Sequence, residues 1–227
     1  ATTEIYTLSL HDALPISVCI DTPIISIAEG AFAGCKNIKE VNFYISLLTL
    51  PQYIFDHCTS LMRVKLPQFV EHIGEHAFSH CSSLQNITLP NTLSTMGAYC
   101  FSHCEKLQSI VIPDDVSAMP EETFSNCTNL ASVDLPDTLT HIGQECFSYC
   151  EALNLIDLPR QLQTIGGGAF AYSAVQTIYI PQSVESIGHE AFAHCSQLTQ
   201  LIVPSHIKLF DDVIDLSDNV TITTTNK

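Results

Sequence analysis

Four histidine–cysteine pairs recur along the chain, and both side chains are ligands that bind zinc. The pairs are His57-Cys58, His80-Cys81, His103-Cys104 and His194-Cys195. A tetrahedral zinc site also needs closely spaced pairs such as C-x-x-C, and the sequence contains none. In a short helix, adjacent side chains point about 100° apart, so each histidine turns away from the core that its cysteine faces. We therefore expect no metal site, no cofactor, and neutral histidines that face solvent. Together with His72 and His141, such a stripe could titrate at about pH 6.5.

The ten cysteines raise the question of disulfide bonds. Seven of them stand in one column, three residues after a recurrent phenylalanine: Cys35, Cys58, Cys81, Cys104, Cys127, Cys150 and Cys195. Stacked units would bring equivalent Cα atoms within the range of a bridge. A ladder of identical cysteines would nevertheless have to pair alternately, whereas a buried free cysteine packs as a small apolar residue. We expect free thiols, which leave the redox compartment undecided.

The sequence offers little for catalysis. It contains no G-x-S-x-G, no H-E-x-x-H and no phosphate-binding loop. The acidic doublets Asp114-Asp115, Glu121-Glu122 and Asp211-Asp212 could bind calcium weakly, but they form no EF-hand loop. A solvated charge pair is the commoner role of such doublets. We predict a protein without enzymatic activity, and the alternative is a catalytic domain in a longer form of the protein.

Composition and charge restrict the partners. The 227 residues include 24 Asp plus Glu against 8 Lys plus Arg, which gives a net charge of −16. Such a chain repels phosphate backbones and anionic membranes, so we expect no nucleic acid partner. Apolar residues make up 46% of the chain, enough to cover a core. No uninterrupted run of about 18 apolar residues is present, so we expect no membrane insertion.

The residues discussed so far are positioned by a repeat with a fixed period. Its anchor is a phenylalanine, which recurs every 23 residues at Phe32, Phe55, Phe78, Phe101, Phe124, Phe147 and Phe170, and after 22 residues at Phe192. A period between about 20 and 50 residues is typical of a solenoid. Its units stack because each is too small to bury its apolar face alone. We predict one continuous, elongated domain.

Each unit combines two hydrophobic periods. From Ala77 to Leu84 the apolar residues follow steps of 1, 3 and 3, which indicate a short helical turn. From Ile87 to Pro90 apolar and polar residues alternate, up to a proline that cannot donate to a sheet. A glycine before the helical turn, Gly74 in this unit, permits a positive φ or a close backbone approach. We predict one short helix or turn and one strand per unit, with all strands in one parallel sheet.

The repeat resembles the BspA-like, or Treponema-type, class of leucine-rich repeats. It reads P-x-x-[VL]-x-x-[IM]-G-x-x-A-F-x-x-C-x-x-L-x-x-[IV]-x-[LIV], and the best copies begin at Pro67, Pro90, Pro136, Pro159 and Pro181. The resemblance covers about residues 24–204. It implies an α/β repeat solenoid, a leucine-rich-repeat arc with one parallel β-sheet on the concave side and short helices or turns on the convex side.

The chain divides into three parts. Residues 1–17 do not fit the repeat, and residues 7–16 resemble the translation of a sequencing adapter, so we predict a non-native segment or an irregular cap. Residues 18–204 are predicted to form the solenoid, with about eight units of 23 residues. Residues 205–227 lose the rhythm, and we predict a C-terminal cap with a final strand around residues 220–223, or a truncated repeat.

The resemblance also implies a function. BspA-like proteins are typically surface or secreted proteins of host-associated bacteria and some mucosal protists, where they act in adhesion to host matrix proteins or to other microbes. We therefore predict a monomeric, non-catalytic protein-binding module at the cell surface or secreted. The alternative is an intracellular scaffold or regulatory repeat region of a larger multidomain protein, which unpaired cysteines favour slightly.

The strand pattern leaves two columns of side chains free to contact a partner. In L-x-x-[IV]-x-[LIV], the residues on both sides of the fourth position point away from the core, because side chains alternate across a strand. The candidate residues on the concave side are Arg63, Lys65, Val111, Asp134, Leu155, Asp157, Tyr179 and Ile202. Exposed apolar and aromatic groups beside charge are typical of interface hot spots. The alternative is an ordinary solvated sheet.

Overall fold

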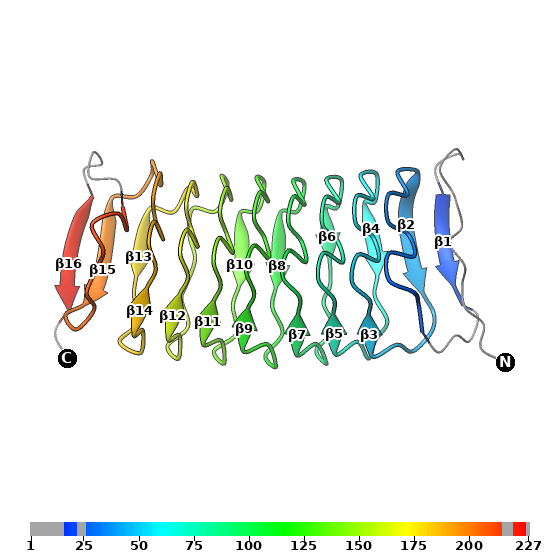
Figure 1. Cartoon of the computed structure of the whole chain (residues 1–227), viewed down its shortest axis with the longest axis horizontal. Coiled ribbons are helices and arrows are strands. Elements are labelled where there is room, and N and C mark those ends of the chain that lie inside the picture. Colours follow the sequence, from blue (N-terminus) through cyan, green and yellow to red (C-terminus); the bar gives the residue numbers. More distant parts are fainter. Residues whose placement is uncertain (1–15, 22–25, 215–219, 226–227) are drawn as a thin grey trace.

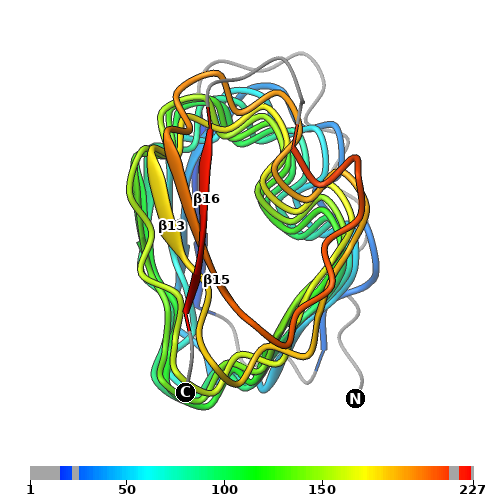
Figure 2. The ribbon, with the colours of Figure 1, turned by 90° about the vertical axis from the view of Figure 1, so that its left-hand side faces the viewer.

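The computed structural model describes residues 16–21, 26–214 and 220–225 and shows a single stack of coils (Figure 1). Seen along the stack, successive coils superpose on one oval outline (Figure 2). The stack runs nearly straight in the view of Figure 1. We therefore name the surface that was predicted to be concave by its content, the strand face, which carries the outward side chains of the strands described next.

One short strand per coil builds the strand face. These strands are β2 (Ile38–Phe43), β4 (Arg63–Lys65), β6 (Asn86–Ile87), β8 (Ser109–Val111), β10 (Ser132–Asp134), β13 (Thr177–Tyr179) and β15 (Gln200–Pro204), with β1 (Ile16–Ile20) and β16 (Thr221–Thr225) at the two ends. Every pairing is parallel, and each residue lies beside its equivalent one coil away, as Val41 lies beside Val64. The hydrogen-bonded ladder comes in three pieces, β1-β2-β4-β6, β10-β8 and β13-β15-β16, where the sequence predicted one sheet.

A second ladder of two-residue strands runs along the stack, and the sequence analysis did not predict it. Its members are β3 (Thr49–Leu50), β5 (His72–Ile73), β7 (Thr95–Met96), β9 (Ala118–Met119), β11 (His141–Ile142), β12 (Thr164–Ile165) and β14 (Ser186–Ile187). The ladder is broken between β7 and β9. In a regular coil the glycine after the strand donates to the previous coil, as Gly97 does to the Ile73 carbonyl at 2.8 Å. Pro120 stands at this position after β9 and has no N–H to donate.

The recurrent glycine is required by close contact between coils. A Cβ atom on Gly97 would lie 2.3 Å from the backbone nitrogen of Glu75, and one on Gly143 would lie 2.6 Å from that of Glu121. No side chain fits at such distances, so glycine lets one coil touch the next. Of the two reasons that the sequence suggested for this glycine, the close approach is confirmed.

The predicted helices are wrong: the described residues form no helix, and the Ala-Phe-x-x-Cys segment is a series of turns. Two residues beside each phenylalanine take the left-handed conformation, such as His76 at φ 53° and His80 at φ 58° minus one degree, that is 57°. The backbone N–H groups of Phe78 and His80 then donate to Cys100 and Ser102 of the next coil, at 2.9 and 2.8 Å. Hydrogen bonds between coils thus replace those of a helix, while the apolar side chains still face inward.

The core consists of columns that run through all coils. The eight phenylalanines are buried and stack ring on ring, with centroids 5.2 to 5.7 Å apart. The cysteine column is buried beside them, and its residues are free thiols, as predicted. Burying these columns removes apolar surface from water in every coil, which is the main favourable contribution to folding.

The two ends continue the solenoid path. Strand β1 begins at Ile16, inside the segment 1–17 that was predicted to be non-native or irregular; residues 1–15 lie outside the described residues. At the other end, the Phe192 N–H donates to the Val213 carbonyl at 2.9 Å, as each phenylalanine does to the following coil. The final strand predicted around residues 220–223 is confirmed, because β16 pairs with β15. Among the described residues we find no helix that is long and apolar enough to cross a membrane.

Candidate functional site

Seven of the eight predicted contact residues are exposed on the strand face. In β4, β8 and β10 the middle residue is buried and its two neighbours are exposed, as the alternation predicts. The exposed apolar side chains are large: Val111, Leu155 and Tyr179 are 64%, 65% and 66% exposed. Such side chains stand on the strand face without covering by the described residues, so they are available to a partner.

Four of these residues line one groove. Val111, Asp134, Leu155 and Asp157 border a groove of about 470 Å³ that runs across three coils. The two carboxylates and the two apolar side chains alternate around it. The groove therefore combines negative charge with apolar surface, whereas its floor is formed by buried strand residues such as Ile110.

The two basic residues lie nearer the N-terminal end and are held by neighbours. The Arg63 guanidinium lies 4.0 Å from the Glu40 carboxylate. The Lys65 ammonium lies over the ring of Tyr44, 4.9 Å from its centroid. Lys65 also lines a groove of about 600 Å³ together with Phe69, an exposed aromatic residue. Sequence analysis missed Tyr44 and Phe69, although each is a large aromatic at a position that the repeat leaves variable.

Ile202 is the exception among the predicted contact residues. It is only 9% exposed, and all of β15 from Leu201 to Pro204 is buried. Its strand is flanked on both sides, with Tyr179 beside Ile202 in β13 and Thr223 beside it in β16. The alternation that exposes the outer residues of shorter strands does not hold here, so Ile202 belongs to the core and not to the contact surface.

The outer turns carry a second ordered surface, made of stacked rings. The position two residues after each phenylalanine is left-handed in every coil that has a side chain there. His57, His80 and His103 stack with centroids 4.1 and 4.3 Å apart. Tyr149 stacks on Tyr172, and Tyr172 on His194, at 4.3 and 4.4 Å. The position two residues before the phenylalanine repeats this with Tyr53, His76 and Tyr99.

These aromatic columns explain where the histidine–cysteine pairs point. The cysteine of each pair is buried, and its sulfur donates to a phenylalanine carbonyl one coil earlier, as Cys81 does to Phe55 at 3.2 Å. Burial raises the pKa of the Cys81 thiol well above its ordinary value, so it stays protonated. The histidine instead joins the outer stack. The prediction that the two side chains diverge is therefore confirmed, although left-handed turns and not helices cause it.

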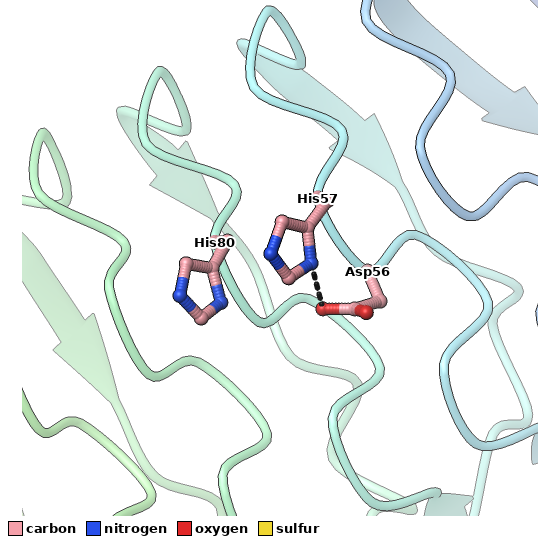
Figure 3. Close-up of side chains that lie close together, drawn as sticks. All are labelled: Asp56, His57 and His80. Atoms are coloured by element: carbon pink, nitrogen blue, oxygen red, sulfur yellow. Dashed lines mark ion pairs between the residues drawn. The ribbon is translucent and has the colours of Figure 1, made fainter.

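One acidic residue joins the histidine stack. The Asp56 carboxylate lies 2.9 Å from Nδ1 of His57, and His80 stacks on the far side of that ring (Figure 3). Burial, followed by the charges of His103 and His57, lowers the pKa of His80. The lowered pKa favours a neutral imidazole, the form that binds metal ions. Among the described residues, Asp56, His57 and His80 are the one group of three side chains whose ligand atoms are close enough to hold a metal.

Parallel coils of about 23 residues with leucine, phenylalanine and cysteine columns define the chain as a leucine-rich-repeat solenoid. It belongs to the BspA type leucine rich repeat region family, whose model matches residues 12–131 and 117–214 in six copies. The comparison with curated protein sequences returned no match.

Solved structures share this fold. A leucine-rich repeat protein from Bacteroides ovatus is 24% identical, with a TM-score of 0.67 over 92% of this chain and 71% of its own. A leucine rich cell surface protein from Faecalibacterium prausnitzii is 21% identical, with a TM-score of 0.54 over 93% and 79%. The pneumococcal vaccine antigen PcpA is 19% identical, with a TM-score of 0.57 over 94% and 69%.

Proposed function

We propose that this chain is a protein-binding module whose strand face holds a protein partner. The observation that carries the proposal is the groove of Val111, Asp134, Leu155 and Asp157, in which exposed apolar side chains lie beside carboxylates. Tyr179 extends this surface toward the C-terminal end. A solenoid presents such side chains on a rigid frame, so a partner can be bound with little loss of conformational freedom in the module.

The charge of the groove indicates the chemistry of the partner. Two carboxylates border the apolar side chains, and the whole chain carries a net charge of −16. A partner segment with basic and apolar residues is complementary to this surface, and its approach is accelerated by the charge. A host matrix protein or another microbial surface protein with such a segment is the partner that we propose.

We place the protein at the cell surface or outside the cell. Two proteins of the same fold support this, since one is described as a cell surface protein and the other as a vaccine antigen. The free thiols do not favour the intracellular alternative. Nine of the ten cysteines are buried, and those of the repeat column serve as donors in the core, so their reduced state follows from the fold and not from the compartment.

The proposal is tested by measuring binding of the immobilised chain to a panel of soluble host matrix proteins and microbial surface proteins. The strand-face variant is Leu155→Ser with Tyr179→Ala. The control is Tyr149→His on the outer turns, because histidine occupies the same column in other coils. We expect the strand-face variant to lose affinity and the control to keep it. The reverse pattern would move the binding surface to the outer turns.

A further inference from the structure

The stack of histidines on the outer turns includes one carboxylate, and this combination occurs in a single coil. The position just after the repeat phenylalanine holds only small residues elsewhere, namely Ala33, Ser79, Ser102, Ser125, Ser148, Ala171 and Ala193. Asp56 is the one acidic residue in that column. It precedes His57, the first histidine of the stack, so the carboxylate lies at the end of a row of imidazole rings.

The three side chains come from two neighbouring coils. The Asp56 carboxylate lies 2.9 Å from Nδ1 of His57, and the rings of His57 and His80 are 4.1 Å apart at 10°. One ligand atom from each of Asp56, His57 and His80 lies within 4.8 Å of the other two. In Figure 3 the carboxylate lies below the His57 ring, and the two imidazoles lie side by side with the same orientation.

We propose that Asp56, His57 and His80 bind one divalent transition-metal ion, with Zn²⁺ as the reference ion. Two imidazole nitrogens and one carboxylate oxygen form a ligand set that suits zinc and also nickel or copper. Three protein ligands leave a fourth position for water, as in open zinc sites. The site is separate from the strand face, so it does not depend on the proposed function.

Binding requires a small inward rotation of the side chains. Ligands about 2.0 to 2.1 Å from a tetrahedral zinc are about 3.3 Å from one another, which is shorter than the upper limit of 4.8 Å found here. Parallel rings must also tilt, because each nitrogen binds a metal in the plane of its ring. The His57 side chain is 53% exposed and has room to turn. Ser79, 2.8 Å from Nδ1 of His80, either orients this ring or moves aside.

The neighbouring cysteines do not complete the site. Cys58 and Cys81 follow the two histidines in sequence, but both are buried on the core side and donate to backbone carbonyls. A thiol must lose its proton to bind zinc, and burial raises the pKa of Cys58 to about 12. The ligand set is therefore nitrogen and oxygen only, which is a spectroscopic prediction.

The test is a calorimetric titration of the full chain with Zn²⁺ at neutral pH. Three variants each take a residue that the same column already holds elsewhere: Asp56→Ser as at Ser79, and His57→Asn or His80→Asn as at Asn126. Asn126 has φ 61°, so asparagine accepts the left-handed backbone. We expect one zinc per wild-type chain and, in each variant, a loss of affinity of more than about tenfold, as for removal of metal-site residues in general.

The matched control is His189→Gln, with glutamine as at Gln144 in the same column. His189 also pairs with a carboxylate, Asp212, at 2.9 Å, but it lies several coils away from the site. Its removal should leave the first equivalent of zinc unchanged. Far-ultraviolet circular dichroism of each variant separates lost binding from lost folding.

Co²⁺ in place of Zn²⁺ reports the ligand type. We expect ligand-field bands of nitrogen and oxygen coordination in the wild type and their loss in His57→Asn. Absence of zinc binding in the wild type, a thiolate-to-cobalt charge-transfer band, or equal affinity in His57→Asn and wild type would each overturn the proposal. None of these outcomes bears on protein binding by the strand face.

Discussion

The Cys81 thiol donates to the carbonyl oxygen of Phe55, one coil earlier, with 3.2 Å between sulfur and oxygen. The same bond recurs from Cys58, Cys104, Cys127, Cys150 and Cys195 at 3.0 to 3.3 Å. Cysteine meets two demands at this position, because it fills apolar space and still offers a donor to a buried carbonyl. The column is therefore a structural feature of the repeat, and its thiols need no metal or disulfide to account for them.

Replacing one cysteine should show the worth of this bond. We expect Cys104→Ala to lower the free energy of unfolding by about 1 to 2 kcal/mol, because it removes a hydrogen bond to Phe78 and leaves a small cavity. Cys104→Ser should cost less, since it keeps a donor and Ser173 occupies the same column. Urea denaturation of both variants checks this. An alanine variant as stable as the wild type would mean that the thiol contributes by size alone.

Thiol accessibility should differ sharply between the folded and unfolded chain. Cys19 is exposed and the other nine cysteines are buried. We expect one cysteine to react rapidly with a thiol reagent under native, non-reducing conditions and all ten to react after denaturation. Several fast thiols in the folded protein would contradict the buried column, and a denatured count well below ten would indicate disulfides.

The buried thiols should make the protein sensitive to alkali. Burial raises the pKa of Cys58 and Cys127 to about 12, whereas an unfolded cysteine titrates at about 8.5. Between these values the unfolded chain loses protons that the folded chain keeps, so stability is full below the lower value and falls as pH rises. Each thiol should contribute a loss of about 1.4 kcal/mol per pH unit in this window. Cys127→Ser should reduce the slope of unfolding free energy against pH by that amount, and an unchanged slope would contradict the assignment.

The glycine between coils should tolerate no side chain. A Cβ on Gly97 would lie 2.3 Å from the Glu75 nitrogen, a backbone atom that cannot move without shifting a coil. We expect Gly97→Ala to destabilise by about 2 to 4 kcal/mol in thermal or urea unfolding. Gly34→Ala is the control: its φ is +70° but nothing lies within 4 Å of the added atom, so only backbone strain of about 1 kcal/mol is expected. Equal costs at both sites would remove the steric explanation.

The columns of the solenoid could be predicted from sequence because each occupies a fixed place in a repeated unit. The buried phenylalanines and cysteines and the alternation around Ile110 all follow from periodicity. The helices could not be predicted correctly, because steps of 1, 3 and 3 fit both a helix and a tight turn. The choice was made by hydrogen bonds to the next coil, such as that from Phe78 to Cys100, which a single unit does not reveal.

The candidate sites show the same limit. Val111 and Asp134 were predicted to be exposed because strand alternation is local. Ile202 was predicted wrongly because its burial depends on the end of the stack, where the repeat changes. The Asp56, His57 and His80 group depends on rings from two coils meeting outside the core, and the histidine column alone did not show which carboxylate would join it.

The strand face should contribute to binding without contributing to stability. Leu155 and Tyr179 are each about two-thirds exposed, so removing their side chains leaves the core unchanged. We expect Leu155→Ser with Tyr179→Ala to weaken binding of a protein partner by about 1 to 3 kcal/mol while the melting temperature stays nearly unchanged. Affinity is measured by surface plasmon resonance and stability by thermal unfolding. A second pair of variants, Asp134→Asn and Asp157→Asn, should slow association and reduce its dependence on salt, because these carboxylates attract a basic partner. If affinity and association rate are the same in all of these variants, the partner does not contact the groove, and the acidic outer turns become the surface to test.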